Sequence, residues 1–194
     1  MLPLCKTNFK MNITKTPISD LLLIEPKVWN DNRGYFYESF STKAFAAAGV
    51  EVNFVQDNQS FSQRGTLRGV HAQKAPFAQG KLVRVIQGSV LDVAVDVRKD
   101  SATFGQHYSV VLSGENHKQL WVPPGFLHGF LTLEDKTIFT YKVSNYYDKE
   151  SEVGVMYNDA DLGINWSDTM DTADFLLSEK DLVLPAFKDF VSPF

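Results

Sequence analysis

The feature that most constrains the fold is a series of short segments with a period of two, running from Val52 to Val143. The clearest is LDVAVDV (91–97), in which leucine and valine alternate with aspartate and alanine. Such alternation is typical of an antiparallel strand with one buried face. Glycine, proline, asparagine or aspartate separates the segments, so the series predicts an all-β jelly-roll barrel or sandwich. Further strands are expected at 81–86, 107–113, 119–122, 130–133 and 137–143.

The sequence before and after this series carries fewer signals of secondary structure. LLLIEP (21–26) and YFYESF (35–40) read as strands, with a DNRG turn before the second. KAFAAAG (43–49), capped by Ser41 or Thr42 and closed by glycine, predicts a short peripheral helix. A helical turn is expected near 174–179. Residues 1–10 have no clear period, and we expect a disordered tail or an alternative start there, followed by one jelly-roll domain over residues 11–194.

Composition narrows the class of protein. The net charge is −4 and no lysine or arginine run stands out, so neither nucleic acid nor an anionic membrane is an expected partner. The single cysteine, Cys5, excludes intrachain disulfides and cysteine-based metal clusters and is compatible with a reducing cytoplasm. We find no apolar run of about 18 residues and no export leader, and therefore expect a cytoplasmic protein.

Two histidine motifs match the two halves of the cupin signature. GTLRGVHAQ places His71 after a glycine and five residues, and PPGFLHG places His128 in Pro-x-Gly-x-x-His. In a metal cupin the first half continues as His-x-His followed by glutamate, all of them ligands. Here Gln73 and Lys81 stand at those positions, and an ammonium group repels a divalent cation. We expect no metal, and a fixed positive charge in an apolar cup is suited to stabilising an oxyanion.

Several longer segments carry a more specific resemblance. They are DNRGYFYESF, FVQDNQS, LRGVHAQ, AQGKLVRVIQGSVLDVAVDVR, LWVPPGFLHGF and YKVSNYY, within Leu22 to Asp181. In this order they resemble the dTDP-4-dehydrorhamnose 3,5-epimerase family. The resemblance implies a homodimer without cofactor or metal that inverts C3 and C5 of dTDP-4-dehydro-6-deoxy-D-glucose through enolates. Its product would feed dTDP-L-rhamnose, a precursor of cell-envelope sugars such as lipopolysaccharide O-antigen.

The resemblance also implies roles for individual residues. His71 would be the general base, paired with Asp181, which holds its tautomer. Lys81 would stabilise the enolate oxygen, and Tyr141 would return a proton on the opposite face of the sugar. Tyr147 would stack on the thymine. The sugar, phosphates and deoxythymidine would be held by Arg33, Glu38, Gln56, Asn58, Arg68, His128, Glu152 and Lys180.

Some local questions stay open at this point. Arg68 and His71 have opposite parity on one strand, so either Gly69 hosts a bulge or one of the two faces a neighbouring subunit or the groove rim. Tyr146 and Tyr147 are adjacent, so only one of them can point inward. Ala72 replaces an aromatic residue expected in many relatives, which is expected to alter contacts with the sugar ring.

Three other functions compete with the double epimerase. A mono-epimerase that acts at C3 or C5 of a related dTDP-4-keto-6-deoxysugar would use the same base, acid and lysine. A metal cupin such as a dioxygenase would use His71, Gln73 and His128 as ligands. A nucleotide-sugar-binding module would need no acid and base on opposite faces of a ring, so the set of His71, Lys81 and Tyr141 argues against it.

Overall fold

The computed structural model describes residues 11–194, and most of its regular elements are short strands. The tail or alternative start predicted at residues 1–10, with Cys5, lies outside the described residues. The strands are β1 (Met11–Lys15), β2 (Leu22–Pro26), β3 (Trp29–Asp31), β4 (Gly34–Phe36), β5 (Gln56–Ser62), β6 (Leu67–Gln73), β7 (Lys81–Gln87), β8 (Ser89–Asp96), β9 (His107–Ser113), β10 (Gln119–Val122), β11 (Phe126–Thr132), β12 (Thr137–Val143) and β13 (Glu152–Gly154). The helical elements are α1 (Thr42–Ala47) and the 3-10 turns η1 (Lys149–Ser151), η2 (Trp166–Asp168), η3 (Thr172–Asp174), η4 (Glu179–Leu182) and η5 (Phe187–Asp189).

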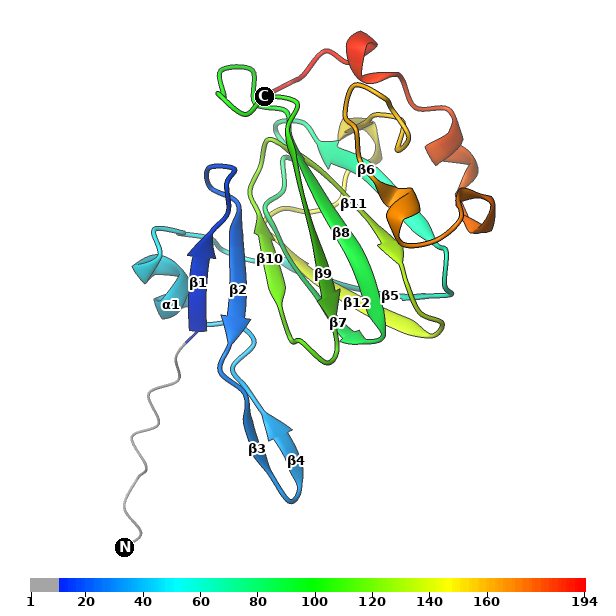
Figure 1. The fold of residues 1–194 in the computed structure, drawn as a ribbon. Helices are drawn as coiled ribbons and strands as arrows, with labels where there is room; N and C mark the ends of the chain where they lie inside the picture. Colours follow the sequence, from blue (N-terminus) through cyan, green and yellow to red (C-terminus); the bar gives the residue numbers. More distant parts are fainter. Residues whose placement is uncertain (1–10) are drawn as a thin grey trace, which may run out of the picture.

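Two antiparallel sheets face each other and form the body of the protein (Figure 1). The larger has the strand order β1-β2-β10-β7-β12-β5, and the smaller has the order β13-β6-β11-β8-β9. The chain changes sheet between β6 and β7 and again between β7 and β8, so neighbours in sequence lie across the barrel from each other. This arrangement confirms the predicted all-β jelly roll with short peripheral helices.

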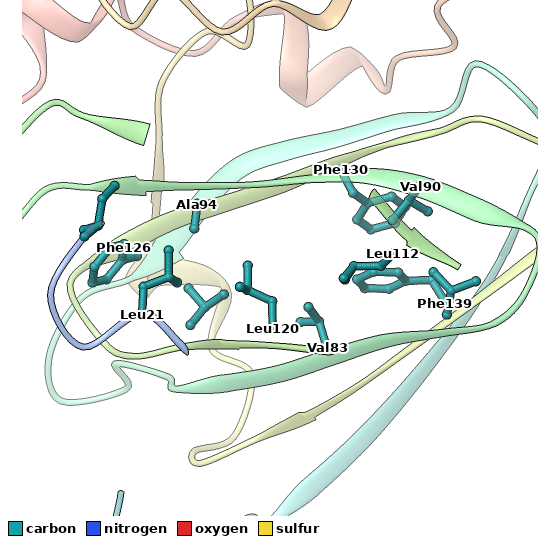
Figure 2. Close-up of a cluster of buried hydrophobic side chains, with 12 residues drawn as sticks. Leu21, Val83, Val90, Ala94, Leu112, Leu120, Phe126, Phe130 and Phe139 are labelled. Atoms are coloured by element: carbon teal, nitrogen blue, oxygen red, sulfur yellow. The ribbon is translucent and has the colours of Figure 1, made fainter. Parts of the chain in front are cut away.

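The main core fills the space between the sheets. Figure 2 shows Leu120 and Val83 of the larger sheet facing Ala94 and Phe130 of the smaller one. All four side chains are at most 5% exposed. Phe130 and Phe139 stack with their ring centroids 4.1 Å apart. Because this apolar packing fills one part of the barrel, polar residues of the same strands gather in the rest of the interior.

A second hydrophobic layer covers the outer face of the smaller sheet, and it corrects the interpretation of residues 91–97 as half-buried. Val93 and Val95 point outward and pack against the C-terminal segment, which contributes Leu162 and Trp166. The opposite face of β8, with Asp92, is buried in the barrel. The alternation therefore separates two buried environments rather than core from solvent.

The N-terminal elements differ partly from expectation. Ser41 caps α1, its Oγ accepting a hydrogen bond from Ala44 N, so the predicted helix is confirmed. The predicted strand at 35–40 is too long, because β4 ends at Phe36. β3 and β4 form a separate hairpin that projects from the body (Figure 1). No helix within residues 11–194 has the length and apolar character needed to cross a bilayer.

The C-terminal segment also differs from the sequence interpretation. The helical turn expected at 174–179 is wrong, because η3 and η4 flank an extended stretch there. Leu176 in this stretch forms a parallel bridge with Thr66 next to β6. The extended stretch leads directly into η4, which contacts β6. The bridge thus carries Asp181 of η4 to the strand that bears His71.

Candidate active site

Two adjoining cavities, with volumes of about 350 Å³ and about 300 Å³, occupy the polar part of the barrel. Both are lined by His71, Lys81, Tyr141 and Lys180, and we call them together the pocket. The first cavity is also lined by Gln56, Asn58, Ala72, Gln73, Gln79, Tyr147 and Glu152. The second cavity is also lined by Ser60, Arg68, His128, Phe130, Phe139, Ser178 and Asp181. Eleven of the thirteen predicted site residues thus lie around one pocket.

A β-bulge brings Arg68 and His71 to the same cavity. His71 pairs with His128 and Arg68 with Phe130, so β6 has one residue more than β11 between these pairs. Gly69 provides this bulge with a φ of 128°, and a Cβ there would lie 2.4 Å from the Cα of Gly129. Only glycine tolerates both the backbone conformation and the close approach. The bulge confirms the first of the two explanations for the opposite parity.

His71, which is partly buried, and Asp181, which is buried, form a dyad. The Nε2 atom of His71 lies 2.6 Å from Oδ1 of Asp181, whose side chain is 3% exposed. The Oγ of Ser178 donates to the other carboxylate oxygen at 2.6 Å. Burial alone would raise the pKa of Asp181, but hydrogen bonds from His71 and Ser178 outweigh it and lower that pKa. The carboxylate therefore stays charged and holds the Nε2 proton, which leaves Nδ1 of His71 free to accept a proton.

Lys81 lies at the start of β7 and lines both cavities. Burial lowers its pKa from 10.5 to about 8, and the negative charges of Asp92 and Glu152 act in the opposite direction. The ammonium group thus remains the major form at neutral pH. An ammonium group that lines the pocket in this way can stabilise a developing oxyanion.

Tyr141 projects from β12, on the other sheet from His71. It pairs in register with Asn58 of β5. Burial raises the pKa of Tyr141, and this effect exceeds the opposing influence of the Arg68 charge and the Asn58 hydrogen bond. The phenol therefore keeps its proton at neutral pH and is able to donate it. A base and an acid from opposite sheets can then face the two sides of a flat ligand.

His128, which lines the second cavity, forms a second histidine–carboxylate pair with Asp92 behind it. Nε2 of His128 lies 3.0 Å from each carboxylate oxygen of Asp92, which is fully buried. The two side chains come from neighbouring strands, β11 and β8, and both point into the barrel. Asp92 thereby fixes the orientation of the His128 ring.

The rim of the first cavity carries a charged cluster. Glu152 accepts hydrogen bonds from Nζ of Lys180 at 2.5 Å and from the hydroxyl of Tyr147 at 3.0 Å. Burial raises the pKa of Glu152, but the Lys180 ammonium and the neighbouring His71 outweigh burial and lower it. Tyr147 lines the cavity, whereas Tyr146 is not among its lining residues.

Gln73 occupies the position of a metal cupin's second histidine, and its side chain is fully engaged. Nε2 donates to the carbonyl oxygens of Phe77 at 2.7 Å and of Tyr146 at 3.0 Å, while Oε1 accepts from Asp148 N at 2.9 Å. Residues 11–194 contain no group of three or more histidine, cysteine, aspartate or glutamate side chains arranged to hold a metal ion. The donor set therefore does not fit a metal cupin.

Two predicted binding residues lie away from the pocket. Arg33 is exposed on the projecting hairpin, where its Nη2 lies 2.5 Å from Oδ2 of Asp31. Glu38 follows this hairpin and does not line either cavity. One chain by itself thus leaves both residues outside the pocket. Ala72 lines the first cavity and packs against the outer hydrophobic layer.

The polar residues that sequence reasoning missed include Asp92, which hydrogen-bonds to His128, and Ser178, which hydrogen-bonds to Asp181. Asp92 was only one of the polar positions in an alternating strand, but an aspartate between Leu91 and Val93 on a strand carries a signal of burial. Ser178 gave no such signal, because it lies in the irregular C-terminal segment. Its contact with Asp181 depends on the fold of η4 against β6.

Comparison with known proteins agrees with this geometry. The family model described as dTDP-4-dehydrorhamnose 3,5-epimerase matches residues 15–189. An epimerase of this name from Shigella flexneri is 51% identical over 180 residues, which are 92% of this chain and 97% of the relative.

Solved structures of epimerases also match this chain closely. The crystal structure of dTDP-4-dehydrorhamnose 3,5-epimerase from Elizabethkingia anophelis NUHP1 matches with a TM-score of 0.88 and 51% identity, over 92% of this chain and 97% of that one. The Legionella pneumophila dTDP-6-deoxy-D-glucose-3,5-epimerase, solved in complex with dTDP-4-keto-L-rhamnose, has a TM-score of 0.88 and 46% identity, over 94% and 95% of the two chains. The fold, the pocket and these matches together show that the chain belongs to the dTDP-4-dehydrorhamnose 3,5-epimerase family.

Proposed function

We propose that this protein inverts C3 and C5 of dTDP-4-dehydro-6-deoxy-D-glucose without a cofactor and gives dTDP-4-dehydro-L-rhamnose for dTDP-L-rhamnose biosynthesis. The observation that carries the proposal is the arrangement of three groups around one pocket. His71 lies on the smaller sheet and is paired with Asp181 of η4, Tyr141 lies on the larger sheet, and Lys81 lines both cavities. Membership of the family supports the same reaction.

In the proposed mechanism, His71 removes the proton at C3, which is acidified by the neighbouring C4 ketone. The electron pair moves into an enolate whose oxygen is stabilised by the Lys81 ammonium. Tyr141 then delivers its hydroxyl proton to C3 on the opposite face, which inverts the centre. The proton on His71 returns to Tyr141 through solvent, and the same groups act at C5, on the other side of the ketone. Each acid–base group is expected to contribute about 10²–10⁴-fold to the rate.

The remaining polar residues of the pocket are proposed to hold the substrate. Arg68 and Lys180 provide positive charge for the diphosphate. Tyr147, at the rim of the first cavity, is proposed to stack on the thymine. Gln56, Asn58, His128 and Glu152 are proposed to bind the sugar and the deoxythymidine.

We further propose that the protein is a homodimer. Arg33 and Glu38 lie outside the pocket of their own chain, although the family resemblance assigns them to substrate binding. The β3–β4 hairpin projects from the body with Tyr35 57% and Phe36 60% exposed. A second copy that accepts this hairpin would cover these rings and bring Arg33 near its pocket. Light scattering should give a mass of two chains, and a monomer at micromolar concentration would contradict the proposal.

We also propose a domain organisation, a location and a metal-free reaction for this enzyme. We propose one jelly-roll domain over residues 11–194 and a cytoplasmic location, where nucleotide sugars are made. No metal takes part, since Gln73 is committed to backbone groups and Lys81 stands where a metal cupin has its glutamate.

A mono-epimerase acting at one carbon is the second candidate, because the same base, acid and lysine serve either reaction. The test is turnover of dTDP-4-dehydro-6-deoxy-D-glucose by chelator-treated protein, coupled to a reductase that accepts the L-rhamno product. Formation of dTDP-L-rhamnose establishes double inversion. Product inverted at one carbon would favour the mono-epimerase, and activity that disappears on chelation and returns with a divalent metal would refute the metal-free mechanism.

A further inference from the structure

The side-chain amide of Gln73 forms hydrogen bonds with the backbone on both sides of Tyr147. Its Nε2 donates to the carbonyl oxygen of Tyr146, the residue before Tyr147, at 3.0 Å. Its Oε1 accepts from the backbone N of Asp148, the residue after Tyr147, at 2.9 Å. A carbonyl and an N–H that flank one residue are the groups that a neighbouring β-strand would bind. The side chain of Gln73 therefore acts on this segment as a strand partner does.

The orientation of this amide is fixed by its surroundings. Nε2 faces two carbonyl oxygens, those of Phe77 and Tyr146, while Oε1 faces a backbone N–H. Gln73 is 4% exposed, so water does not compete for these groups. A glutamate of the same shape would place a carboxylate against two carbonyl oxygens, which is costly in a buried site. The site therefore specifically requires an amide.

Tyr147 depends on its backbone for its position. Its side chain is at the exposed rim, 57% accessible, and its hydroxyl donates to Glu152 at 3.0 Å. The same segment is tied at Asn145, whose carbonyl oxygen accepts from Nε2 of Gln79 at 2.8 Å. Asp148 in turn accepts a hydrogen bond from Ser151 N, just before Glu152. Gln73 thus lies at the base of the segment that presents Tyr147 and Glu152 to the first cavity.

We propose that Gln73 is a positioning residue for the nucleotide base: it sets the place of Tyr147 and so the affinity for the deoxythymidine end of the substrate. In metal cupins a metal-binding histidine occupies this position. Here the side chain of Gln73 holds the backbone of residues 146–148 instead. This inference rests on the proposed function, in which Tyr147 stacks on thymine.

A double-mutant cycle on dTDP binding tests the inference. Calorimetry at pH 8 should show that Gln73→Glu raises the Kd for dTDP at least tenfold and that Tyr147→Ala does the same. In the Tyr147→Ala background, Gln73→Glu should add less than twofold, since the ring on which it acts is gone. In turnover, Gln73→Glu should raise KM at least tenfold and lower kcat less than threefold, because His71, Lys81 and Tyr141 remain in place.

Trp166→Phe is the control. Trp166 is 3% exposed and its Nε1 donates to the carbonyl oxygen of Tyr157 at 2.7 Å, in the outer hydrophobic layer and away from the pocket. It should change stability without changing the Kd for dTDP more than twofold. If Gln73→Glu does not fold, Gln73→Ala, which removes the amide without adding charge, takes its place in the cycle.

The outcomes distinguish a failure of the role of Gln73 from a failure of the stacking role of Tyr147 in the proposed function. If Tyr147→Ala weakens dTDP binding but Gln73→Glu does not, or if the two effects multiply, Gln73 does not act through Tyr147 and the inference is overturned. If Tyr147→Ala leaves dTDP binding unchanged, the stacking role of Tyr147 in the proposed function fails, and the role of Gln73 fails with it.

Discussion

Replacing Lys81 by methionine should make the protein more stable and nearly inactive at the same time. Burial lowers the pKa of Lys81 from 10.5 to about 8, so holding its charge in the pocket destabilises the folded state at neutral pH. At 1.36 kcal/mol per pH unit this difference corresponds to about 3 kcal/mol. Because the pocket admits some water, we expect a net stabilisation of about 2 kcal/mol in Lys81→Met. For a chain of this size that is a rise in Tm of about 5 °C.

The pH dependence identifies the cause of this stabilisation. A lysine with a lowered pKa binds fewer protons in the folded state than in the unfolded state between about 8 and 10.5. The contribution of Lys81 to wild-type stability therefore rises with pH through this range, as the folded protein releases a proton that the unfolded chain still holds. The advantage of Lys81→Met should be largest below pH 8 and should disappear near pH 10.5.

Urea denaturation of wild type and Lys81→Met at a series of pH values measures the difference in their free energies of unfolding. The contributions of the other titrating groups are the same in both proteins and cancel in this difference. Lys43→Met, at an exposed position on α1, is the control and should change stability by less than about 0.5 kcal/mol. Epimerase turnover of Lys81→Met should fall by about 10²–10³-fold, as expected when an oxyanion-stabilising group is lost. A variant that is less stable than wild type at pH 7, or whose advantage does not change with pH, would show that the buried charge of Lys81 does not destabilise the fold.

Three further substitutions test the catalytic acid Tyr141, the partner of His71 and the ion pair of Arg98 with Asp96. Tyr141→Phe should lower inversion more than solvent exchange, since His71 can still return the proton to the original face; an equal loss of both in D₂O would contradict the two-face mechanism. Asp181→Asn should lower turnover by roughly 10²–10⁴-fold at neutral pH while dTDP binding measured by calorimetry persists. Arg98→Met should destabilise the protein by about 3 kcal/mol in urea, because it leaves buried Asp96 without its cation; a loss below about 1 kcal/mol would show that this pair is not needed.

Local pattern and motif predicted the jelly roll and the central residues of the site. The period of two on β7, β8, β9 and β12 identified strands, because each of them has two chemically different faces. The burial of both faces of β8 was not predictable from the strand itself. It depends on the C-terminal segment, whose Leu162 and Trp166 cover the outer face from some 70 residues away in sequence.

Contacts between distant segments also limited the prediction of the site. Gly69 alone suggested a bulge, and the register between β6 and β11 confirms it. The partnership of His128 with Asp92 depends on which strands become neighbours, and no spacing in the sequence states that. Arg33 lies on a hairpin whose surroundings a single chain does not determine.

In the proposed mechanism one histidine, His71, takes protons from both carbons that flank the ketone. Proton NMR of dTDP-4-dehydro-6-deoxy-D-glucose in D₂O measures the exchange at each carbon. Wild-type protein is compared with His71→Asn once both are shown to bind dTDP with the same affinity. We predict that the wild type places deuterium at C3 and C5, and that His71→Asn places it at neither while still binding dTDP. Exchange that continues at either carbon in His71→Asn would show that another group is the base there.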